Sequence, residues 1–441
     1  MKRLLSLLLC AVLALFCATT AQAAGVSITL TASEYALHYA FDAGAQDPFV
    51  ILEYTTPAEK GWMMLYSADG HFEGDVSLAY SGAGGKTSVA LTSARTTGSI
   101  GKASTTLPKA VDYQKPTGKS NAKVTDFVLT ETPEGFHYAF NAIGTDYMLL
   151  YWRSKEQTVT QPVYPDENGH YEGDVVSELT FARTQFTVQV KSGSGSMKKE
   201  ATVRKGYQAP EAPQRQEGRL SGVTVCIDAG HQENGRFVNE PIGPGLSGST
   251  SGKGGMAQGT KTNRRESIVC LEIGMLLRDE LLRQGANVVM TREDQTTFHT
   301  NIERCEIAEA GGAQIMLRLH CNNSSNHSKR GIQVYGPLNS DYAKAVADAD
   351  TYREMGQKLL DAMKTRVGMT LANSTGMVRL NDNYVGNNWA KMMCFLVEMG
   401  YLSNPAEEYL LVTPVYQQWL AEGMADGVYE IAVARGWAQA Q

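Results

Sequence analysis

The chain has 441 residues, 43% of them hydrophobic and 20% charged, with a formal net charge of −6. At roughly 100–200 residues per domain, this length excludes one ordinary domain and predicts about two to four. A mildly acidic chain has no general attraction to nucleic acid or to anionic membranes, so neither is an expected partner.

Residues 1–23 have the three-part pattern of a bacterial secretion signal. Lys2 and Arg3 precede a short apolar run at 4–18, and "AQA" at 21–23 has the small-x-small pattern of a cleavage site. A membrane anchor is the alternative, but the run is shorter than the about 20 residues needed to cross a bilayer. We therefore expect a protein of the cell envelope or outside it, with no transmembrane span after cleavage.

The next segment repeats itself. "HYAFDA" at 38–43 returns as "HYAFNA" at 137–142, and "GHFEGDV" at 70–76 returns as "GHYEGDV" at 169–175, both at an offset of 99 residues. A fixed period of this size indicates tandem domains. Short alternating runs between turn signals predict two small all-β sandwich repeats, of about seven strands each, at 24–112 and 122–207.

The repeats contain two pairs of equivalent histidines, which are His38 with His137 and His71 with His170. The duplication explains them, and we expect a structural or surface role, because the sequence shows no clustered ligands for a metal. Repeats of this kind could bind a cell-wall polymer or another partner, or act as spacers, and the sequence does not choose. A polar segment with prolines at 208–219 predicts an extended linker.

From residue 220 to residue 436 the pattern changes to alternating strands and helices. Near-continuous apolar runs predict strands at 223–227, 287–292, 313–319, 331–336 and 391–398, and helical patterns lie at 263–285, 301–312, 341–368 and 416–436. Apolar runs of this kind are typical of strands covered on both faces. The alternation predicts an α/β fold with an open mixed or parallel sheet, whose ligands bind beyond the carboxyl ends of the strands.

Five cysteines lie in this half, an odd number without CxxC spacing, so we expect no disulfide framework. Cys226 and Cys394 fall inside apolar runs, as buried small hydrophobic residues do.

Four polar residues stand where a ligand would bind. His231, His320 and Glu398 each follow a predicted strand, and Glu266 lies in the first turn of the helix after a Gly-rich loop. If the three strands are parallel neighbours, these side chains converge on one edge of the sheet. Two histidines and one carboxylate suit a catalytic zinc ion, because three protein ligands leave a fourth position open. A second carboxylate can transfer protons, so the set suits amide hydrolysis.

Each of these residues also has a simpler interpretation. Glu266 stands three residues after Asn263 and could close a capping box. Either histidine could be an ordinary residue at a strand end, and His299 and His327 are weaker candidates as ligands because neither ends an apolar strand. Glu398 is harder to explain in this way, since an unpaired carboxylate after a buried strand is costly.

Residues 222–436 resemble the zinc-dependent N-acetylmuramoyl-L-alanine amidases of the Amidase_3 family. The matching motifs, in the family's order, are "IDAGH" (227–231), "RRES" with its helix, "VVMTRED" (288–294), "IERCEIA" (302–308), "RLHCN" (318–322), "GIQVYG" (331–336) and "LVEMGYLSNPAEEYLL" (396–411).

The resemblance implies that His231, Glu266 and His320 bind one Zn²⁺ ion and that Glu398 is the catalytic carboxylate. It implies a peptidoglycan substrate, cut at the amide between the lactyl group of N-acetylmuramic acid and L-alanine of the stem peptide. Asp228 is a candidate acceptor that orients His231.

Two further residues within the matched motifs, Arg292 and Asn322, are candidates for supporting the ligands or contacting substrate. The chain departs from the family pattern in "HQENGRF" after the first histidine, in a Gly-rich loop at 243–255, and in Arg318 and Cys321 beside His320. These departures leave substrate preference open. Two other functions remain: a different secreted zinc-dependent amide hydrolase, such as a peptidase, and a non-catalytic cell-wall-binding protein.

Overall fold

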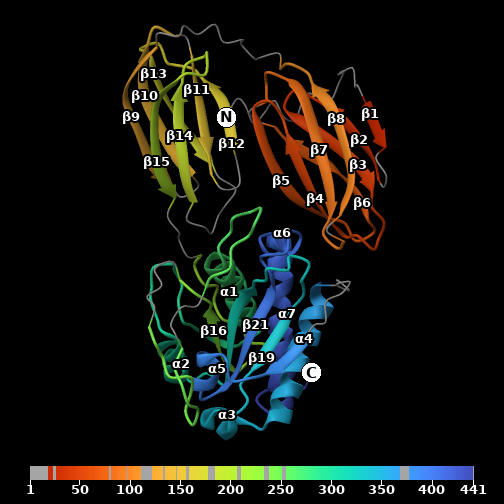
Figure 1. The fold of residues 1–441 in the computed structure, drawn as a ribbon, viewed down its shortest axis with the longest axis vertical. Coiled ribbons are helices and arrows are strands. Elements are labelled where there is room, and N and C mark those ends of the chain that lie inside the picture. The colour runs from red at the N-terminus through yellow and green to blue at the C-terminus, as the bar shows by residue number, and fades with distance from the viewer. Residues whose placement is uncertain are drawn as a thin grey trace. The chain divides into compact units, whose positions relative to one another are not determined.

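The structure is a computed structural model. It describes residues 18–440 apart from 23–25, 79–80, 97, 111–121, 133–134, 146, 155–157, 177–183, 206–209, 233–237, 251–254 and 368–376. The chain divides into two compact units, Met1–Gly206 and Tyr207–Gln441, and each is described by itself (Figure 1). No helix among the described residues is both long and apolar enough to cross a membrane.

The N-terminal unit is all β. Its described strands are β1 (Ala18–Gln22), β2 (Ser27–Ala32), β3 (Ala36–Asp42), β4 (Phe49–Thr55), β5 (Glu59–Tyr66), β6 (His71–Ser77), β7 (Gly85–Ser93), β8 (Ser99–Leu107), β9 (Lys123–Thr132), β10 (Gly135–Ile143), β11 (Met148–Arg153), β12 (Thr158–Val163), β13 (His170–Val176), β14 (Thr184–Lys191) and β15 (Met197–Lys205). They form three sheets, in the orders β1-β2-β3-β6, β13-β10-β9 and β15-β14-β11-β12-β5-β4-β7-β8.

The predicted secretion signal lies mostly outside the described residues. Of its 23 positions, residues 18–22 are described, and they form β1, which pairs with β2. The signal itself therefore stays a prediction.

Two separate cores hold the N-terminal unit together. One contains side chains of β2, β3 and β6 with those of β4, β5, β7 and β8, and the other lies within residues 122–203. Alternation along the strands builds these cores, because successive side chains of a strand point to opposite faces. In β3, for example, Leu37, Tyr39 and Phe41 are buried while the residues between them are more exposed.

Seven described strands, β2–β8 and β9–β15, fall in each predicted repeat, in line with the expected number. The pairing of β3 with β6 has the same register as that of β10 with β13, shifted by 99 residues. The interpretation as a duplicated sandwich stays a prediction.

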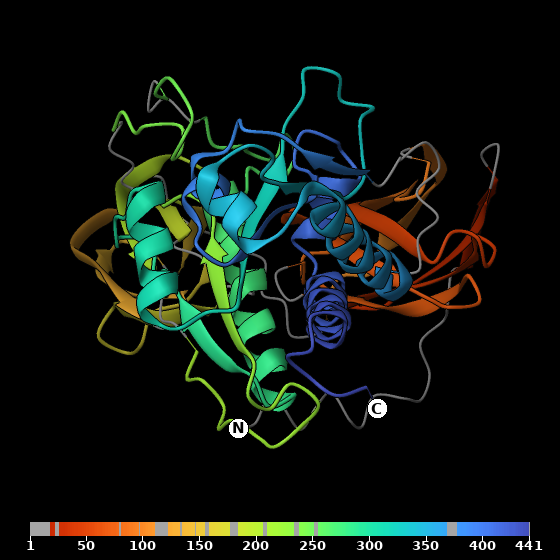
Figure 2. The same ribbon diagram turned by 90° about the horizontal axis from the view of Figure 1, so that it is seen from below.

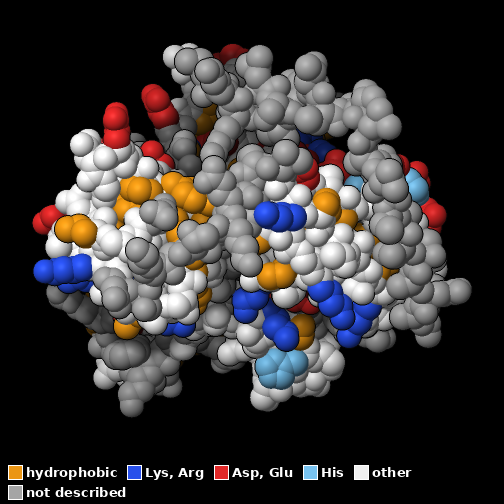
Figure 3. Space-filling view, turned by 90° about the horizontal axis from the view of Figure 1, so that it is seen from above, with side chains coloured by type: hydrophobic (Ala, Val, Ile, Leu, Met, Phe, Trp, Pro, Cys, Tyr) orange, Lys and Arg blue, Asp and Glu red, His pale blue; other side chains and the backbone are white. Residues whose placement is uncertain are grey.

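Some large hydrophobic side chains of this unit remain exposed, and on the face seen in Figure 3 hydrophobic side chains gather on the left of the view.

The C-terminal unit is built on one six-stranded sheet. Its strands are β16 (Thr224–Ala229), β17 (Asn287–Met290), β18 (Ile315–Asn322), β19 (Gln333–Gly336), β20 (Met377–Leu380) and β21 (Met393–Tyr401). The sheet order is β17-β16-β18-β21-β19-β20, and only the pairing of β21 with β19 is antiparallel. The predicted mixed sheet is confirmed, and so is the condition that the site required, because β16, β18 and β21 are parallel neighbours.

Helices cover both faces of this sheet. They are α1 (Glu266–Arg283), α2 (Asn301–Ala310), α3 (Asp341–Val346), α4 (Ala349–Val367), α5 (Val385–Trp389), α6 (Glu407–Leu411) and α7 (Pro414–Ala434). The helices α1, α4 and α7 pack together on one face, and α2 and α5 lie on the other (Figure 2). The three central strands are therefore almost entirely buried, which explains their continuous apolar runs.

The predicted single helix at 341–368 is wrong. The structure has two helices, α3 and α4, interrupted at Ala347, whose backbone is extended with φ −165° and ψ 162°. The cause lies in the next residue. The Asp348 carboxylate accepts a hydrogen bond from the Thr351 main-chain N–H at 2.8 Å. This contact caps the start of α4 and competes with continuation of the preceding helix.

The predicted linker at 208–219 is attached to the C-terminal unit over its described part. Gln216 donates its main-chain N–H to the Leu282 carbonyl at 3.0 Å, and the Arg215 guanidinium donates to the Gly285 carbonyl at 2.9 Å. Residues 210–219 thus lie against the end of α1, and the division between the units falls before Tyr207.

Candidate active site

The carboxyl ends of three parallel strands bring the site together. His231 follows β16, while His320 lies in β18 directly opposite Glu398 in β21. The Gly230 main-chain N–H donates to the Leu319 carbonyl at 2.9 Å, which draws the end of β16 against β18. A Cβ atom at position 230 would lie 2.4 Å from that carbonyl and 2.7 Å from His320 Cε1, so the close approach requires glycine.

Glu266 links the two histidines. Its Oε1 atom lies 3.0 Å from His231 Nε2 and 3.0 Å from His320 Nδ1, and it accepts the Cys321 main-chain N–H at 3.0 Å. The two imidazole rings are 4.8 Å apart between centroids, with an angle of 77° between their planes. The structure thus brings together the three residues predicted as metal ligands.

The donor atoms of these three residues fit a metal ion. One ligand atom from each of His231, Glu266 and His320 lies within 4.8 Å of the others. Two imidazoles and one carboxylate form the donor set of many catalytic zinc sites. Burial alone would raise the pKa of Glu266, but hydrogen bonds from both histidines outweigh it and lower this pKa well below its ordinary value. Burial lowers the pKa of His320, which favours the neutral imidazole that binds metals.

The capping-box interpretation of Glu266 does not match the structure. The helix α1 begins at Glu266 itself, and the residue before it, Arg265, occupies the N-cap position without a side-chain cap. Asn263 lies outside the helix, in a left-handed conformation with φ 54°. The second carboxylate oxygen of Glu266 accepts the Ala257 main-chain N–H at 2.7 Å, so this contact fixes the carboxylate toward the histidines.

Glu398 lies in a different environment from Glu266. Its Oε2 atom is shielded from solvent and has no hydrogen-bond partner among the residues that the structure describes. Burial, and secondly the negative charge of Glu266, raise the pKa of Glu398 to about 8. A carboxyl group with a pKa near neutrality can exchange protons at physiological pH, which is the property that a general acid–base catalyst needs.

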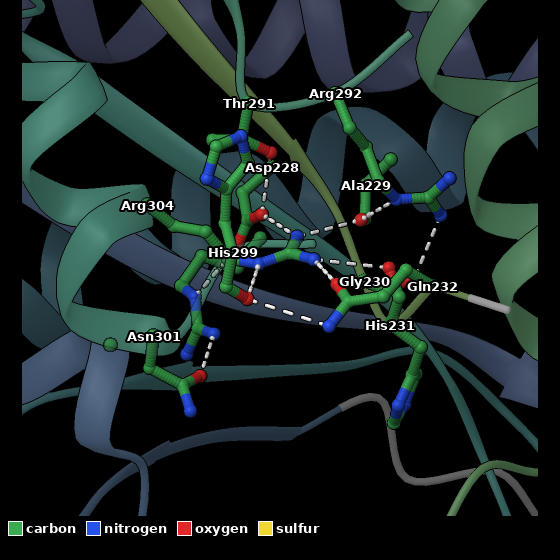
Figure 4. Close-up of polar contacts among 12 residues, drawn as sticks. Asp228, Ala229, Gly230, His231, Gln232, Thr291, Arg292, His299, Asn301 and Arg304 are labelled. Atoms are coloured by element: carbon green, nitrogen blue, oxygen red, sulfur yellow. Dashed lines mark hydrogen bonds and ion pairs between the residues drawn. The ribbon is translucent and has the colours of Figure 1, made fainter. Parts of the chain in front are cut away.

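A layer of buried polar side chains supports the loop that carries His231. Asp228 is fully buried, and its carboxylate accepts hydrogen bonds from Arg304 and from Thr291, the latter at 2.8 Å (Figure 4). It also accepts a hydrogen bond from Arg318 at 2.9 Å. These two guanidinium groups hold the pKa of Asp228 well below its ordinary value despite the opposing effect of burial.

Asp228 was predicted to orient His231 by accepting a hydrogen bond from it, but the contacts of its carboxylate are with other residues. Its carboxylate contacts two arginines and a threonine, and one of these arginines, Arg304, donates to the His231 main-chain carbonyl at 3.0 Å. His231 has a left-handed backbone with φ 59°, which is uncommon for a residue other than glycine. Arg304 thus stabilises a strained position next to the atoms predicted to bind the metal. Sequence reasoning missed this arginine, although it stands inside the motif "IERCEIA".

Arg292 and Asn322 are placed differently from each other. Arg292 is buried and donates to the carbonyls of Ala229 at 2.8 Å and Gly230 at 2.9 Å, so it supports the same loop from beneath. Asn322 lies at the cleft surface, where its amide donates to Gln333 Oε1 at 3.1 Å. Its position is suitable for contact with a substrate.

The site opens into a cleft of about 1060 Å³. The four predicted residues line it together with side chains from other loops, among them Glu240, Asn301, Tyr384 and His299. His327 lies elsewhere, with Nδ1 at 2.6 Å from the Ser403 carbonyl. Glu240 had no signal in the sequence. It accepts the Ile302 main-chain N–H at 2.8 Å and so fixes the start of α2 beside the cleft.

The five cysteines of this unit are buried free thiols. Burial raises the pKa of Cys321, the neighbour of His320, well above its ordinary value. A protonated thiol is a poor metal ligand, so Cys321 is a weaker candidate ligand at this position than His320.

Comparison with known proteins shows which family the C-terminal unit resembles. Residues 225–430 match the family model of N-acetylmuramoyl-L-alanine amidase. The germination-specific N-acetylmuramoyl-L-alanine amidase of Bacillus subtilis is 26% identical over 231 residues, which cover 49% of this chain and 83% of the relative. The probable cell wall amidase LytH of Staphylococcus aureus is 27% identical over 218 residues, and the match spans 48% of this chain and 60% of that relative.

One solved structure, an N-acetylmuramoyl-L-alanine amidase from Clostridium difficile 630, shares 24% identity with this chain. The match covers 48% of this chain and 96% of that one, with a TM-score of 0.38. The family model and the curated relatives agree with each other. Residues 225–430, within the C-terminal unit, therefore match the N-acetylmuramoyl-L-alanine amidase family of enzymes.

Proposed function

We propose that the protein is a secreted, zinc-dependent peptidoglycan amidase. It cuts the amide between N-acetylmuramic acid and L-alanine of the stem peptide. One observation carries this proposal: Glu266 Oε1 lies 3.0 Å from a nitrogen of each histidine, beside the unpaired Oε2 atom of Glu398. Family membership supplies the substrate class.

The ligands assigned to the metal are His231, Glu266 and His320. A zinc ion held by them would supply a Lewis acid, able to polarise the scissile carbonyl and to lower the pKa of water. The protein's own residues do the rest. Glu398 accepts a proton from the attacking water and delivers it to the leaving amine of L-alanine. Arg304, which contacts both Asp228 and the His231 carbonyl, keeps the loop that carries His231 in place during the reaction.

The N-terminal unit belongs to the same proposal. Relatives named as cell wall amidases accord with a site of action outside the cytoplasm, which the predicted signal at 1–23 would serve. In that setting the β unit either binds wall polymer or sets the distance between the wall and the cleft.

The test is digestion of purified sacculi by the full chain, followed by mass spectrometry of the soluble products. We expect stem peptides with a free L-alanine amine, and no release of reducing sugars. A chelator should abolish the release, and added Zn²⁺ should restore it. Cleavage only between amino acids would show a peptidase instead, and binding to sacculi without any cleavage would show a wall-binding protein.

Glu398→Gln tests the assignment of the proton carrier. We expect the variant to lose at least about 100-fold in rate, the usual range for removal of a general acid–base group, while it keeps its zinc. Glu306→Gln removes a carboxylate from an exposed position of α2 and is the matched control. Wild-type activity in Glu398→Gln would overturn the role of Glu398, and loss of zinc from it would make Glu398 a ligand.

A further inference from the structure

Asn322 lies in the cleft beside the predicted ligand His320 and the proposed proton carrier Glu398. It follows His320 by two residues in β18, so the two side chains point to the same face of the sheet, and both line the cleft with Glu398. The strand register shifts here, because β21 holds one extra residue between the partners of His320 and Asn322, which are Glu398 and Tyr401. Irregularities of this kind re-aim side chains next to active sites.

The main chain fixes the orientation of the Asn322 carboxamide. The main-chain N–H of Asn323, which can only donate, donates to Asn322 Oδ1 at 2.8 Å. The atom at this position must therefore be the amide oxygen. The amide nitrogen, Nδ2, is then the atom that donates to Gln333 Oε1 at 3.1 Å. It follows that Gln333 presents its own oxygen, and not its nitrogen, to Asn322.

Gln333 continues this order of donors and acceptors. It lies in β19, directly opposite Glu398 in β21. Its Oε1 atom also accepts the Tyr335 hydroxyl at 2.5 Å, and its Nε2 atom donates to the Tyr401 hydroxyl oxygen at 3.1 Å. If this carboxamide turned over, its NH₂ group would meet the NH₂ group of Asn322, and two donors repel each other. Gln333 is thus a fixed acceptor that holds the Asn322 amide in one orientation.

One N–H of Asn322 is left for a ligand. An amide nitrogen carries two protons, and among the residues that the structure describes Gln333 is the one acceptor for Asn322 Nδ2. Arg304, a charged donor of the same cleft, differs in this respect, because each of its three side-chain nitrogens donates to an oxygen of the protein. The Asn322 side chain is half-buried in the wall of the cleft. It is therefore a donor whose orientation is set before a substrate binds.

The reaction has an oxygen that needs such a donor, which is that of the scissile carbonyl. When water attacks an amide, this oxygen gains negative charge in the transition state. A preorganised N–H group stabilises that charge more than it stabilises the neutral carbonyl, so it accelerates the chemical step. The proposed role of Glu398 is to exchange protons with the water and with the leaving amine. That role leaves the carbonyl oxygen to another group of the protein.

We propose that Asn322 donates its remaining N–H to the oxygen of the scissile carbonyl, and that Gln333 is the positioning residue that holds Asn322 in place to do so. The inference rests on the proposed amide hydrolysis and assigns two further residues to it. Neither side chain transfers a proton. Asn322 stays a neutral donor, and the charge on the oxygen disappears when the carbonyl forms again and the C–N bond breaks.

Steady-state kinetics of the full chain with zinc, on a soluble muropeptide that keeps its muramic acid–L-alanine bond, test the role of Asn322. Asn322→Ala should lower kcat about 100–1000-fold, the usual loss for one such donor, and leave KM nearly unchanged. Asn322→Asp has the same shape without the N–H and should lose at least as much. Asn326→Ala, which changes an exposed asparagine in the loop after β18, is the matched control and should keep wild-type kinetics.

Gln333→Met tests the positioning role. Methionine keeps much of the volume of glutamine but makes none of its hydrogen bonds, so kcat should fall, by less than in Asn322→Ala. In the double variant, Gln333→Met should add nothing to the loss caused by Asn322→Ala, because Gln333 acts only through Asn322. The pH profile of activity should be unchanged in each variant, since neither side chain titrates. Losses that multiply in the double variant would overturn the role of Gln333.

A phosphinate analogue of the scissile amide, which mimics the tetrahedral transition state, gives a readout that does not depend on turnover. Calorimetry should show that Asn322→Ala weakens its binding by the factor lost from kcat. Circular dichroism and zinc content check that each variant is folded and keeps its metal.

Wild-type kcat in Asn322→Ala, a loss confined to KM, or loss of zinc would overturn the role of Asn322. A loss of kcat in Tyr384→Phe but not in Asn322→Ala would give that role to the Tyr384 hydroxyl, which also lines the cleft. An inactive wild type would instead contradict the proposed amidase function itself.

Discussion

At the scale of single residues, Arg304 is the side chain on which the geometry of the site depends most. It contacts Asp228, Ala229 and the His231 carbonyl at once. Lysine keeps the charge but cannot make these contacts together, since it lacks the planar fork of donors. We expect Arg304→Lys to lower zinc affinity of the C-terminal cluster about 10–100-fold, measured by competition with a chromogenic chelator.

Arg353→Lys is the control for that measurement. Arg353 lies on the exposed side of α4, where it pairs with Asp350, so the same substitution should leave zinc affinity unchanged. An Arg304→Lys variant with wild-type affinity would show that the His231 backbone holds its conformation without this support.

Glu407 predicts a pH dependence of stability. It is buried, and its carboxylate accepts the main-chain N–H groups of Tyr401 and Gly331, each at 2.8 Å. Burial raises the pKa of Glu407 from 4.5 to about 7. A group whose pKa is higher in the folded state contributes stability below its unfolded pKa, and that contribution is lost as pH rises through the folded value.

We therefore expect the free energy of unfolding of the wild type, relative to Glu407→Gln, to fall between about pH 4.5 and 7. The fall is at most about 3 kcal/mol, since one pKa unit corresponds to about 1.4 kcal/mol. Urea unfolding at several pH values measures it, with the exposed Glu354→Gln as control. A constant difference between wild type and Glu407→Gln across this window would contradict the raised pKa.

At the scale of elements, two glycines near the site should respond in opposite ways to alanine. Gly230 ends β16, and a Cβ atom there would lie 2.4 Å from the Leu319 carbonyl. Gly274 lies inside α1, where a Cβ atom would meet its nearest neighbours at 3.5 Å, an ordinary contact.

We expect Gly230→Ala to destabilise the C-terminal unit and to weaken zinc binding, because β16 must move away from His320. Gly274→Ala should instead stabilise the unit by about 0.5–1 kcal/mol, since alanine is favoured over glycine within a helix. Thermal unfolding and zinc titration of the pair measure both effects. Similar behaviour of the two variants would contradict this account of the packing between β16 and β18.

The sequence predicted the elements that carry the site better than those around it. Apolar runs located β16, β18 and β21, and the polar residues at the carboxyl ends of these runs, His231, His320 and Glu398, located the site. The prediction of one helix at 341–368 failed because a local hydrogen bond, from the Thr351 main-chain N–H to the Asp348 carboxylate, competes with a continuous helix. The roles of Arg304 and Glu240 could not be predicted, because their contacts join segments more than 60 residues apart.

At the scale of the whole molecule, the cores of the two units should unfold as separate transitions. Leu52 is fully buried in the core formed by β2–β8. Leu52→Ala should cost that core about 2–5 kcal/mol. In differential scanning calorimetry we expect more than one transition, with Leu52→Ala lowering only that of the β unit. A single transition shifted as a whole would show that the units unfold together.

The unpaired oxygen of Glu398 has a consequence for how such a chain evolves. A buried carboxylate oxygen without a partner among the described residues is a cost to the fold, and the proposed proton transfer gives a reason to keep it. Many neutral replacements at this position would relieve that cost. A descendant freed from selection for amide cleavage would therefore lose the glutamate readily and become more robust as it did so. On the proposed role of Glu398, selection for activity, and not for folding, keeps residue 398 acidic.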